Sequence, residues 1–224
     1  MGYYIDLEKI TIDDYRVKLA SAYLPPSRMI LKEKLNERFE YFKNFGIINV
    51  KGLIQMLKKK DKFAELSMVE CLSSEYLTIL LRELNSTLPK PNKISDFIEV
   101  AKDAIDSLEK IGISNTEKLY DKVVKKSDRQ KLADLTGLKY EVILELTKLA
   151  DLSRIKWVGV TYAQMLYDLG VDTVEKVSES DPNDLHERIN QMIKDKNIFK
   201  GAIGLNDVKI LIESANDLPF EIEY

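Results

Sequence analysis

Apolar residues recur every three or four positions along almost the whole chain, a spacing that places them on one face of an α-helix. Between residues 27 and 45, for example, Leu35, Phe39 and Phe42 share a face. The tail at 220–224 alternates apolar and polar residues as a strand does, but no second alternating stretch is present to pair with it. The pattern therefore predicts an all-α protein.

Helix-capping residues predict where several of these helices begin. Thr11 and Asp14 have the spacing of a capping box, in which two side chains satisfy free amides at the start of a helix. Ser27 follows two prolines and is expected to cap the next helix. Ser95 is expected to cap a long helix that ends near Ile111.

Residues 42–85 are repeated at 108–151 without a gap, at a constant offset of 66 positions. A repeat of this length indicates that each copy is one supersecondary unit packing on its neighbours. A shorter third copy at 169–177 echoes 111–119. The matched pairs include Gly46 with Gly112, Ile47 with Ile113, Asn49 with Asn115, Leu66 with Leu132, and Leu80 with Leu146.

Each copy also predicts the same helical corner. A glycine such as Gly112 is expected to end one helix in the left-handed conformation, and Asn115 to cap the helix that follows. We therefore divide the chain into an N-terminal helical pair at 1–41, a degenerate first copy at 42–107, and a second copy with a C-terminal extension at 108–224.

Composition limits the classes of function. Of the 224 residues, 45% are hydrophobic and 32% are charged, a balance that is typical of a globular protein with a sizeable core. The net charge of −3 argues against a dedicated nonspecific nucleic-acid binder, which usually carries a basic domain. No apolar run approaches the length of a membrane span and the N-terminus lacks a signal pattern, so we expect a cytoplasmic protein with no membrane partner.

Reactive and metal-binding side chains are scarce. One cysteine, Cys71, cannot form an internal disulfide, and one histidine, His186, argues against a zinc site. The segment Gly201-Ala202-Ile203-Gly204 lacks the lysine of a phosphate-binding loop. We expect no metal, no cofactor and no enzymatic activity.

One segment has the residues of a DNA-backbone motif. It places Ile155, Val158, Gly159, Ala163 and Leu166 at the spacing apolar-x-x-apolar-Gly-x-x-x-Ala-x-x-apolar, and so resembles the helix-hairpin-helix motif. The resemblance implies that backbone amides at the start of the second helix hold one nucleic-acid phosphate without reading bases. The implied contact residues are Arg154, Lys156, Trp157, Val158, Gly159, Val160 and Thr161.

The chain departs from that motif at two places. Trp157 replaces the first hairpin glycine, and Thr161 stands where the motif usually has a lysine. An indole there would crowd a phosphate, but it could stack on a base or anchor a protein surface. A weaker preceding hairpin would use Thr136, Gly137, Leu138 and Lys139.

The stretch of roughly 130–190 is similar as a whole to an uncharacterised family of tandem helix-hairpin-helix-like domains, whose closing helix resembles 212–215. This resemblance implies SAM-like helical units and no assigned function. Two functions stay open: a module that binds the DNA or RNA backbone without sequence specificity, and a protein-interaction or scaffold module that uses the same hairpin surface with Trp157 as its anchor.

Overall fold

The computed structural model describes residues 2–97 and 99–224, and this part of the chain contains helices, turns and two isolated bridges but no strand. The all-α prediction is therefore confirmed for the described residues. Met1 belongs to the predicted N-terminal pair and Ile98 to the helix predicted from Ser95, and both lie outside the described residues.

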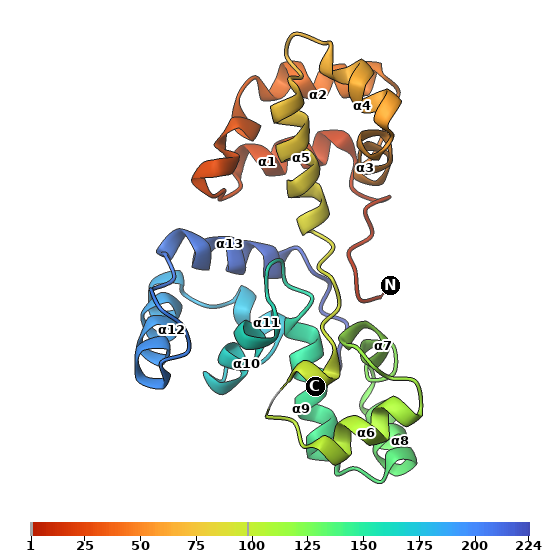
Figure 1. Ribbon diagram of the computed structural model, residues 1–224, viewed down its shortest axis with the longest axis vertical. Helices are drawn as coiled ribbons and strands as arrows, with labels where there is room; N and C mark the ends of the chain where they lie inside the picture. The colour runs from red at the N-terminus through yellow and green to blue at the C-terminus, as the bar shows by residue number, and fades with distance from the viewer. Residues whose placement is uncertain (1, 98) are drawn as a thin grey trace. The chain divides into compact units, whose positions relative to one another are not determined.

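The chain forms two compact units (Figure 1). One unit contains residues 6–88, and the other contains residues 89–224 together with the N-terminal segment up to Ile5. The division after Leu88 falls inside the copy predicted at 42–107. Each unit therefore contains one of the two matched repeats.

The unit at 6–88 places the N-terminal helices beside the first repeat. Helix α1 packs on α2, and α5 contacts α3, α4 and a 3₁₀ helix, η1. The elements are α1 (Ile12–Ser21), η1 (Pro26–Lys32), α2 (Leu35–Asn44), α3 (Val50–Lys58), α4 (Lys60–Ser67) and α5 (Ser74–Ser86).

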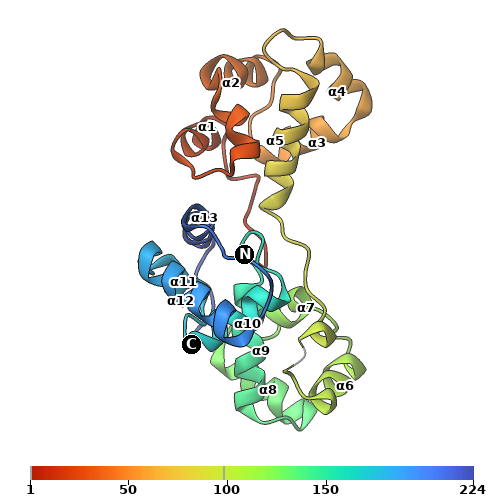
Figure 2. The ribbon, with the colours of Figure 1, turned by 60° about the vertical axis from the view of Figure 1, so that its left-hand side comes forward.

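In the larger unit, α9 lies between α8 and α10, and α13 packs on α11 and α12 (Figures 1 and 2). Its elements are a 3₁₀ helix η2 (Ile94–Asp96), α6 (Lys102–Lys110), α7 (Thr116–Tyr120), α8 (Lys126–Thr136), α9 (Tyr140–Leu152), α10 (Val160–Asp168), α11 (Val174–Ser178), α12 (Pro182–Lys196) and α13 (Leu205–Asn216).

The helix boundaries follow the repeat of the sequence. Helix α5 spans Ser74–Ser86 and α9 spans Tyr140–Leu152, so both ends are shifted by the offset of 66 residues. Helices α3, α7 and α11 each follow a corner and each contact the helix two elements later, which is α5, α9 and α13. The short echo at 169–177 is therefore a third copy of the corner.

Each corner ends one helix on a glycine with positive φ, which is 83° at Gly46, 85° at Gly112 and 75° at Gly170. Glycine adopts this conformation without the steric penalty of a Cβ. The amide of the following residue then bonds back to a carbonyl five residues earlier. These bonds are Ile47 N to Phe42 O (3.1 Å), Ile113 N to Leu108 O (3.0 Å) and Val171 N to Leu166 O (3.1 Å).

A short polar side chain caps the helix after each corner, because the first amides of a helix lack partners inside it. The cap predicted at Asn115 is confirmed, and so is the Thr11 cap of α1, which accepts from the amide of Asp14. The second bond of the predicted capping box is absent, because the carboxylate of Asp14 accepts from the hydroxyl of Thr11 and not from its backbone amide. In the three corner caps, a side-chain oxygen accepts a hydrogen bond from a backbone amide three residues later. The pairs are Asn49 with Gly52 N (2.8 Å), Asn115 with Lys118 N (2.9 Å) and Thr173 with Lys176 N (3.1 Å).

Two expected caps are wrong. Ser27 lies inside η1, and Ser95 lies inside η2, so neither starts an α-helix. Pairing across the chain overrides the local signal at Ser95, because the amide of Ile94 donates to the carbonyl of Ser114 (3.1 Å). Helix α6 begins only at Lys102.

Candidate interaction site at the Trp157 hairpin

The hairpin between α9 and α10 has a buried apolar base. Ile155, Val158, Ala163 and Leu166, the apolar and small positions of the matched motif, are all buried in the core of the larger unit. The amide of Val158 donates to the carbonyl of Ile155 (3.1 Å) and closes the turn. Lys156 and Trp157, which lie between Ile155 and Val158, therefore stand at the tip of the hairpin.

Trp157 occupies that tip with an unusual backbone. Its φ is +65°, in the left-handed region, and 46% of the residue is exposed. The position is the one where the matched motif has its first glycine, and the backbone keeps the conformation that glycine would adopt. A left-handed L-residue costs roughly 1–2 kcal/mol, and bulky residues are rare there. The protein therefore presents an indole on a strained turn.

Lys156 accompanies the indole. Its Nζ lies 4.3 Å from the centre of the Trp157 ring, a distance at which the ammonium is attracted to the π face. The hairpin tip thus combines a large apolar surface with one positive charge.

Arg154 does not lie at the tip, which corrects its predicted role as a phosphate contact. Its side chain is buried, and the residue is only 1% exposed. The guanidinium pairs with Asp151 (2.6 Å) and donates to the carbonyls of Tyr3 (3.1 Å) and Pro219 (2.9 Å). It also lies 4.6 Å from the ring of Tyr120. Arg154 therefore joins the N-terminal segment and the C-terminal tail to the end of α9.

The remaining tip residues begin α10. Gly159 is the N-cap, is exposed, has φ −86°, and has open space where a Cβ would stand. Val160 is half-buried and Thr161 is exposed. This segment is accessible, as the motif requires, but its φ at Gly159 is available to any residue.

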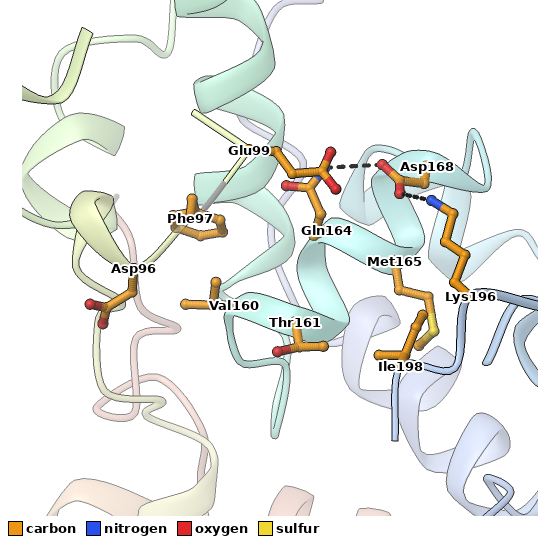
Figure 3. Close-up of a pocket in the computed structure, with 10 residues that line it drawn as sticks. All are labelled: Asp96, Phe97, Glu99, Val160, Thr161, Gln164, Met165, Asp168, Lys196 and Ile198. Atoms are coloured by element: carbon orange, nitrogen blue, oxygen red, sulfur yellow. Dashed lines mark hydrogen bonds and ion pairs between the residues drawn. The ribbon is translucent and has the colours of Figure 1, made fainter. Parts of the chain in front are cut away.

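A pocket of about 460 Å³ lies along the side of α10, next to the hairpin (Figure 3). It is formed by three segments that are distant in sequence: the end of η2 with the residues after it, helix α10, and the end of α12 with the loop beyond it. Its lining residues are Asp96, Phe97, Glu99, Val160, Thr161, Gln164, Met165, Asp168, Lys196 and Ile198.

Carboxylates outnumber cations in this pocket. Asp168 accepts from Lys196 Nζ (2.6 Å) and from Gln164 Nε2 (3.0 Å), as Figure 3 shows for the Lys196 pair. Asp96 and Glu99 add two further negative charges. On α9, partial burial and the charges of Glu99 and Asp168 raise the pKa of Glu145. The surroundings of α10 are therefore acidic.

The second predicted hairpin lies at the other end of α9. Gly137 ends α8 with φ +72°, and the hydroxyl of Thr136 donates to the carbonyl of Leu132 (2.7 Å). Leu138 is half-buried and Lys139, the N-cap of α9, is exposed. Because α9 has 13 residues, about 20 Å of helix separate the two hairpins, so the structure does not bring them together.

A comparison with known protein families identifies the family of this chain. A family model described as Domain of unknown function (DUF4332) matches residues 99–218, more than half of the chain. The chain belongs to this family. No curated protein and no solved structure matches it.

The DUF4332 match contains both hairpins and most of the pocket lining, whereas the unit at 6–88 lies outside it. Within the described part of this DUF4332 chain, no helix is long and apolar enough to cross a membrane. In the same residues, no three His, Cys, Asp or Glu side chains are grouped as ligands for a metal ion.

Sequence reasoning missed the pocket residues. Asp96, Glu99 and Lys196 carry no motif, and they line one pocket only because η2 with the residues after it and the end of α12 both pack near α10. The spacing of Gln164 and Asp168, four residues apart on one helix face, was the only local signal.

Proposed function

We propose that this DUF4332 chain is a non-enzymatic protein-binding module, and that the helix-hairpin-helix-like turn at 155–161 is its contact surface. The observation that carries the proposal is Trp157, whose exposed indole stands on a left-handed backbone at the hairpin tip. Strained backbone positions concentrate where function requires them. Tryptophan is also among the residues that most often dominate the energy of protein interfaces.

The electrostatics of the hairpin favour a protein partner over a phosphate backbone. Arg154 is enclosed in the core, so Lys156 is the cation that remains at the tip. The adjoining pocket contributes the carboxylates of Asp96, Glu99 and Asp168, which repel phosphate. The indole at the first glycine place also occupies the space that the motif leaves for a phosphate oxygen.

A displayed random-peptide library, selected against the full chain, tests the proposal. The affinity of the selected peptides is then measured for the wild type, for Trp157→Ala and for Leu135→Ala. Leu135 is a matched control because it is an exposed apolar residue of the same unit, near the end of α8 and away from the Trp157 hairpin. We expect Trp157→Ala to weaken binding by about tenfold or more and Leu135→Ala to have little effect.

Two results would overturn the proposal. The first is a set of peptides whose affinity does not depend on Trp157. The second is retention of single- or double-stranded DNA in a mobility-shift titration, lost on Lys156→Glu and weakening steeply with salt, because that behaviour is the signature of phosphate binding.

A further inference from the structure

The strained tip at Trp157 depends on what holds the base of its hairpin. A left-handed L-residue persists only where the surrounding structure fixes the backbone on both sides of it. After Trp157, Val158 is buried and its amide donates to the carbonyl of Ile155 (3.1 Å). Before Trp157, the buried side chain of Arg154 is held by two other segments of the chain. The contacts of Arg154 therefore bear directly on the conformation of the tip.

The tail segment, residues 219–224, supplies part of that hold. The guanidinium of Arg154 donates to the carbonyl of Pro219 (2.9 Å), and the hydroxyl of Tyr224 donates to Oδ2 of Asp151 (2.9 Å). Asp151 binds the same guanidinium through its other carboxylate oxygen (2.6 Å). Both ends of the tail segment therefore meet one buried ion pair at the base of the hairpin.

Between these ends, further hydrogen bonds fix the tail segment. The amide of Glu223 donates to the carbonyl of Val124 (2.9 Å), and its carbonyl accepts from the fully buried guanidinium of Arg129. The hydroxyl of Tyr120 donates to Oε2 of Glu221 (3.3 Å). These partners belong to α7, α8 and the turn between them, so the tail segment connects this part of the larger unit with the end of α9.

Polar contacts dominate the attachment of the tail segment. Leu218 is the last residue along the chain in the buried core, and beyond it Phe220 and Tyr224 are 52% and 48% exposed. Segments with few buried apolar contacts open at a much lower cost in free energy than the core does. The tail segment is therefore able to leave its place while the rest of the unit stays folded.

We propose that the tail segment is a strap that holds the Trp157 hairpin in its binding conformation, and that release of the strap weakens partner binding. This inference rests on the proposed protein-binding function and names the regulation of that site. Release takes one acceptor from Arg154 and one donor from Asp151, so the base of the hairpin loosens and Trp157 leaves the left-handed region more often. The apparent affinity falls with the population of the binding conformation.

The test compares the full chain with two variants that weaken the strap. One variant lacks residues 219–224, and the other is Tyr224→Phe, which loses the hydroxyl bonded to Asp151 but keeps the ring. Tyr41→Phe is the matched control, because Tyr41 is an exposed tyrosine of α2 in the other unit. Trp157 is the only tryptophan of the sequence, so its indole N–H resonance reports the hairpin conformation without any ligand.

We expect the indole resonance of Trp157 to shift in both strap variants and to stay in place in Tyr41→Phe. An acetylated peptide of residues 219–224, added to the truncated chain, should restore the wild-type resonance, which also shows that this chain is folded. An unshifted resonance in a truncated chain that circular dichroism shows to be folded would overturn the inference. If the truncated chain does not fold, an unshifted resonance in Tyr224→Phe overturns it instead.

The effect on binding is measured with a peptide selected against the full chain. Truncation of the strap should weaken its binding about fivefold or more, within the usual range of coupling between two sites. Coupling is reciprocal, so saturation of the full chain with this peptide should slow hydrogen exchange of the Glu223 amide by the same factor. That amide is a direct probe, because its bond to the carbonyl of Val124 forms only when the strap is docked. Exchange that the peptide leaves unchanged would contradict the coupling.

These measurements separate the inference from the proposed function. If no selected peptide depends on Trp157, the proposed function is wrong, and the ligand-free resonance still decides whether the strap holds the hairpin. If the peptides depend on Trp157 but bind the full and the truncated chain alike, the hairpin remains the contact surface and the strap inference is wrong.

Discussion

The guanidinium of Arg154 lies 2.6 Å from the carboxylate of Asp151, and both side chains are buried. The other carboxylate oxygen of Asp151 accepts from the amide of Val174 (3.1 Å) and from the hydroxyl of Tyr224 (2.9 Å). The pair therefore connects the end of α9 with the start of α11 and with the C-terminal tail. The guanidinium of Arg154 also donates to the carbonyls of Tyr3 and Pro219.

Arg154→Met should destabilise the larger unit by about 3–5 kcal/mol, because it leaves the buried carboxylate of Asp151 without its cation. Arg188→Met is the control, since Arg188 forms a half-exposed pair with Asp184 and its loss should cost less than about 1 kcal/mol. Urea denaturation followed by circular dichroism measures both. Equal losses of stability would contradict the structural role of Arg154.

Trp157→Gly should stabilise the protein relative to Trp157→Ala by about 1 kcal/mol, because both variants lack the indole but only glycine relieves the left-handed strain at φ +65°. Both variants should lose peptide binding to the same extent. Thermal unfolding and peptide titration on the two proteins separate backbone strain from side-chain contact. Equal stability of the two variants would show that the turn relaxes without a cost.

Gly112→Ala should destabilise the protein by about 1–2 kcal/mol, because φ at Gly112 is +85° and a Cβ is strained there even though the space is open. Gly159→Ala, at φ −86° and also in open space, meets no such strain and should cost only about 0.5 kcal/mol, because alanine is a poorer N-cap than glycine. Chemical denaturation of the two variants gives the comparison. A tolerated alanine at Gly112 would contradict the corner geometry.

Asp172 should contribute stability that disappears in acid. Burial raises the pKa of this carboxyl, but hydrogen bonds from Lys148 and Lys176 outweigh burial and lower the pKa below its usual value. The contribution is therefore present above the unfolded-state pKa and is lost as the pH falls through the lower folded-state pKa.

Asp172→Asn removes this titrating group, so the variant should lose less stability than the wild type between the unfolded-state and folded-state pKa values. Denaturation midpoints measured across that pH range provide the check. Asp134→Asn, at an exposed carboxylate on α8, is the control and should reproduce the wild-type dependence. An unchanged slope in Asp172→Asn would show that the two lysines do not hold the carboxylate in its charged form.

Local signals predicted the helical corners well. Gly46, Gly112 and Gly170 end helices with positive φ, and Asn49 and Asn115 cap the helices that follow. These features depend on interactions over three to five residues, which any single stretch of sequence contains. Ser95 failed as a cap because the neighbouring Ile94 pairs with Ser114, a partner that no local pattern reveals.

At the candidate site, too, the sequence predicted the local features and missed those that depend on distant residues. The spacing of Ile155, Val158, Gly159 and Ala163 predicted a turn with a buried base and an accessible tip, and the structure contains both. Arg154 was assigned to that tip because it is a basic residue directly before the segment that resembles the helix-hairpin-helix motif. Its burial depends on Tyr3 and Pro219, which are far away along the chain.

The sequence by itself determined the helices, the corners and the repeat, because caps, glycine conformations and the apolar period act within a few residues. Only the tertiary structure decided which charges are buried and which surround α10. Asp96, Glu99 and Lys196 come from segments about a hundred residues apart, and the packing of those segments alone sets their distances. The chemistry available at the hairpin follows from that packing.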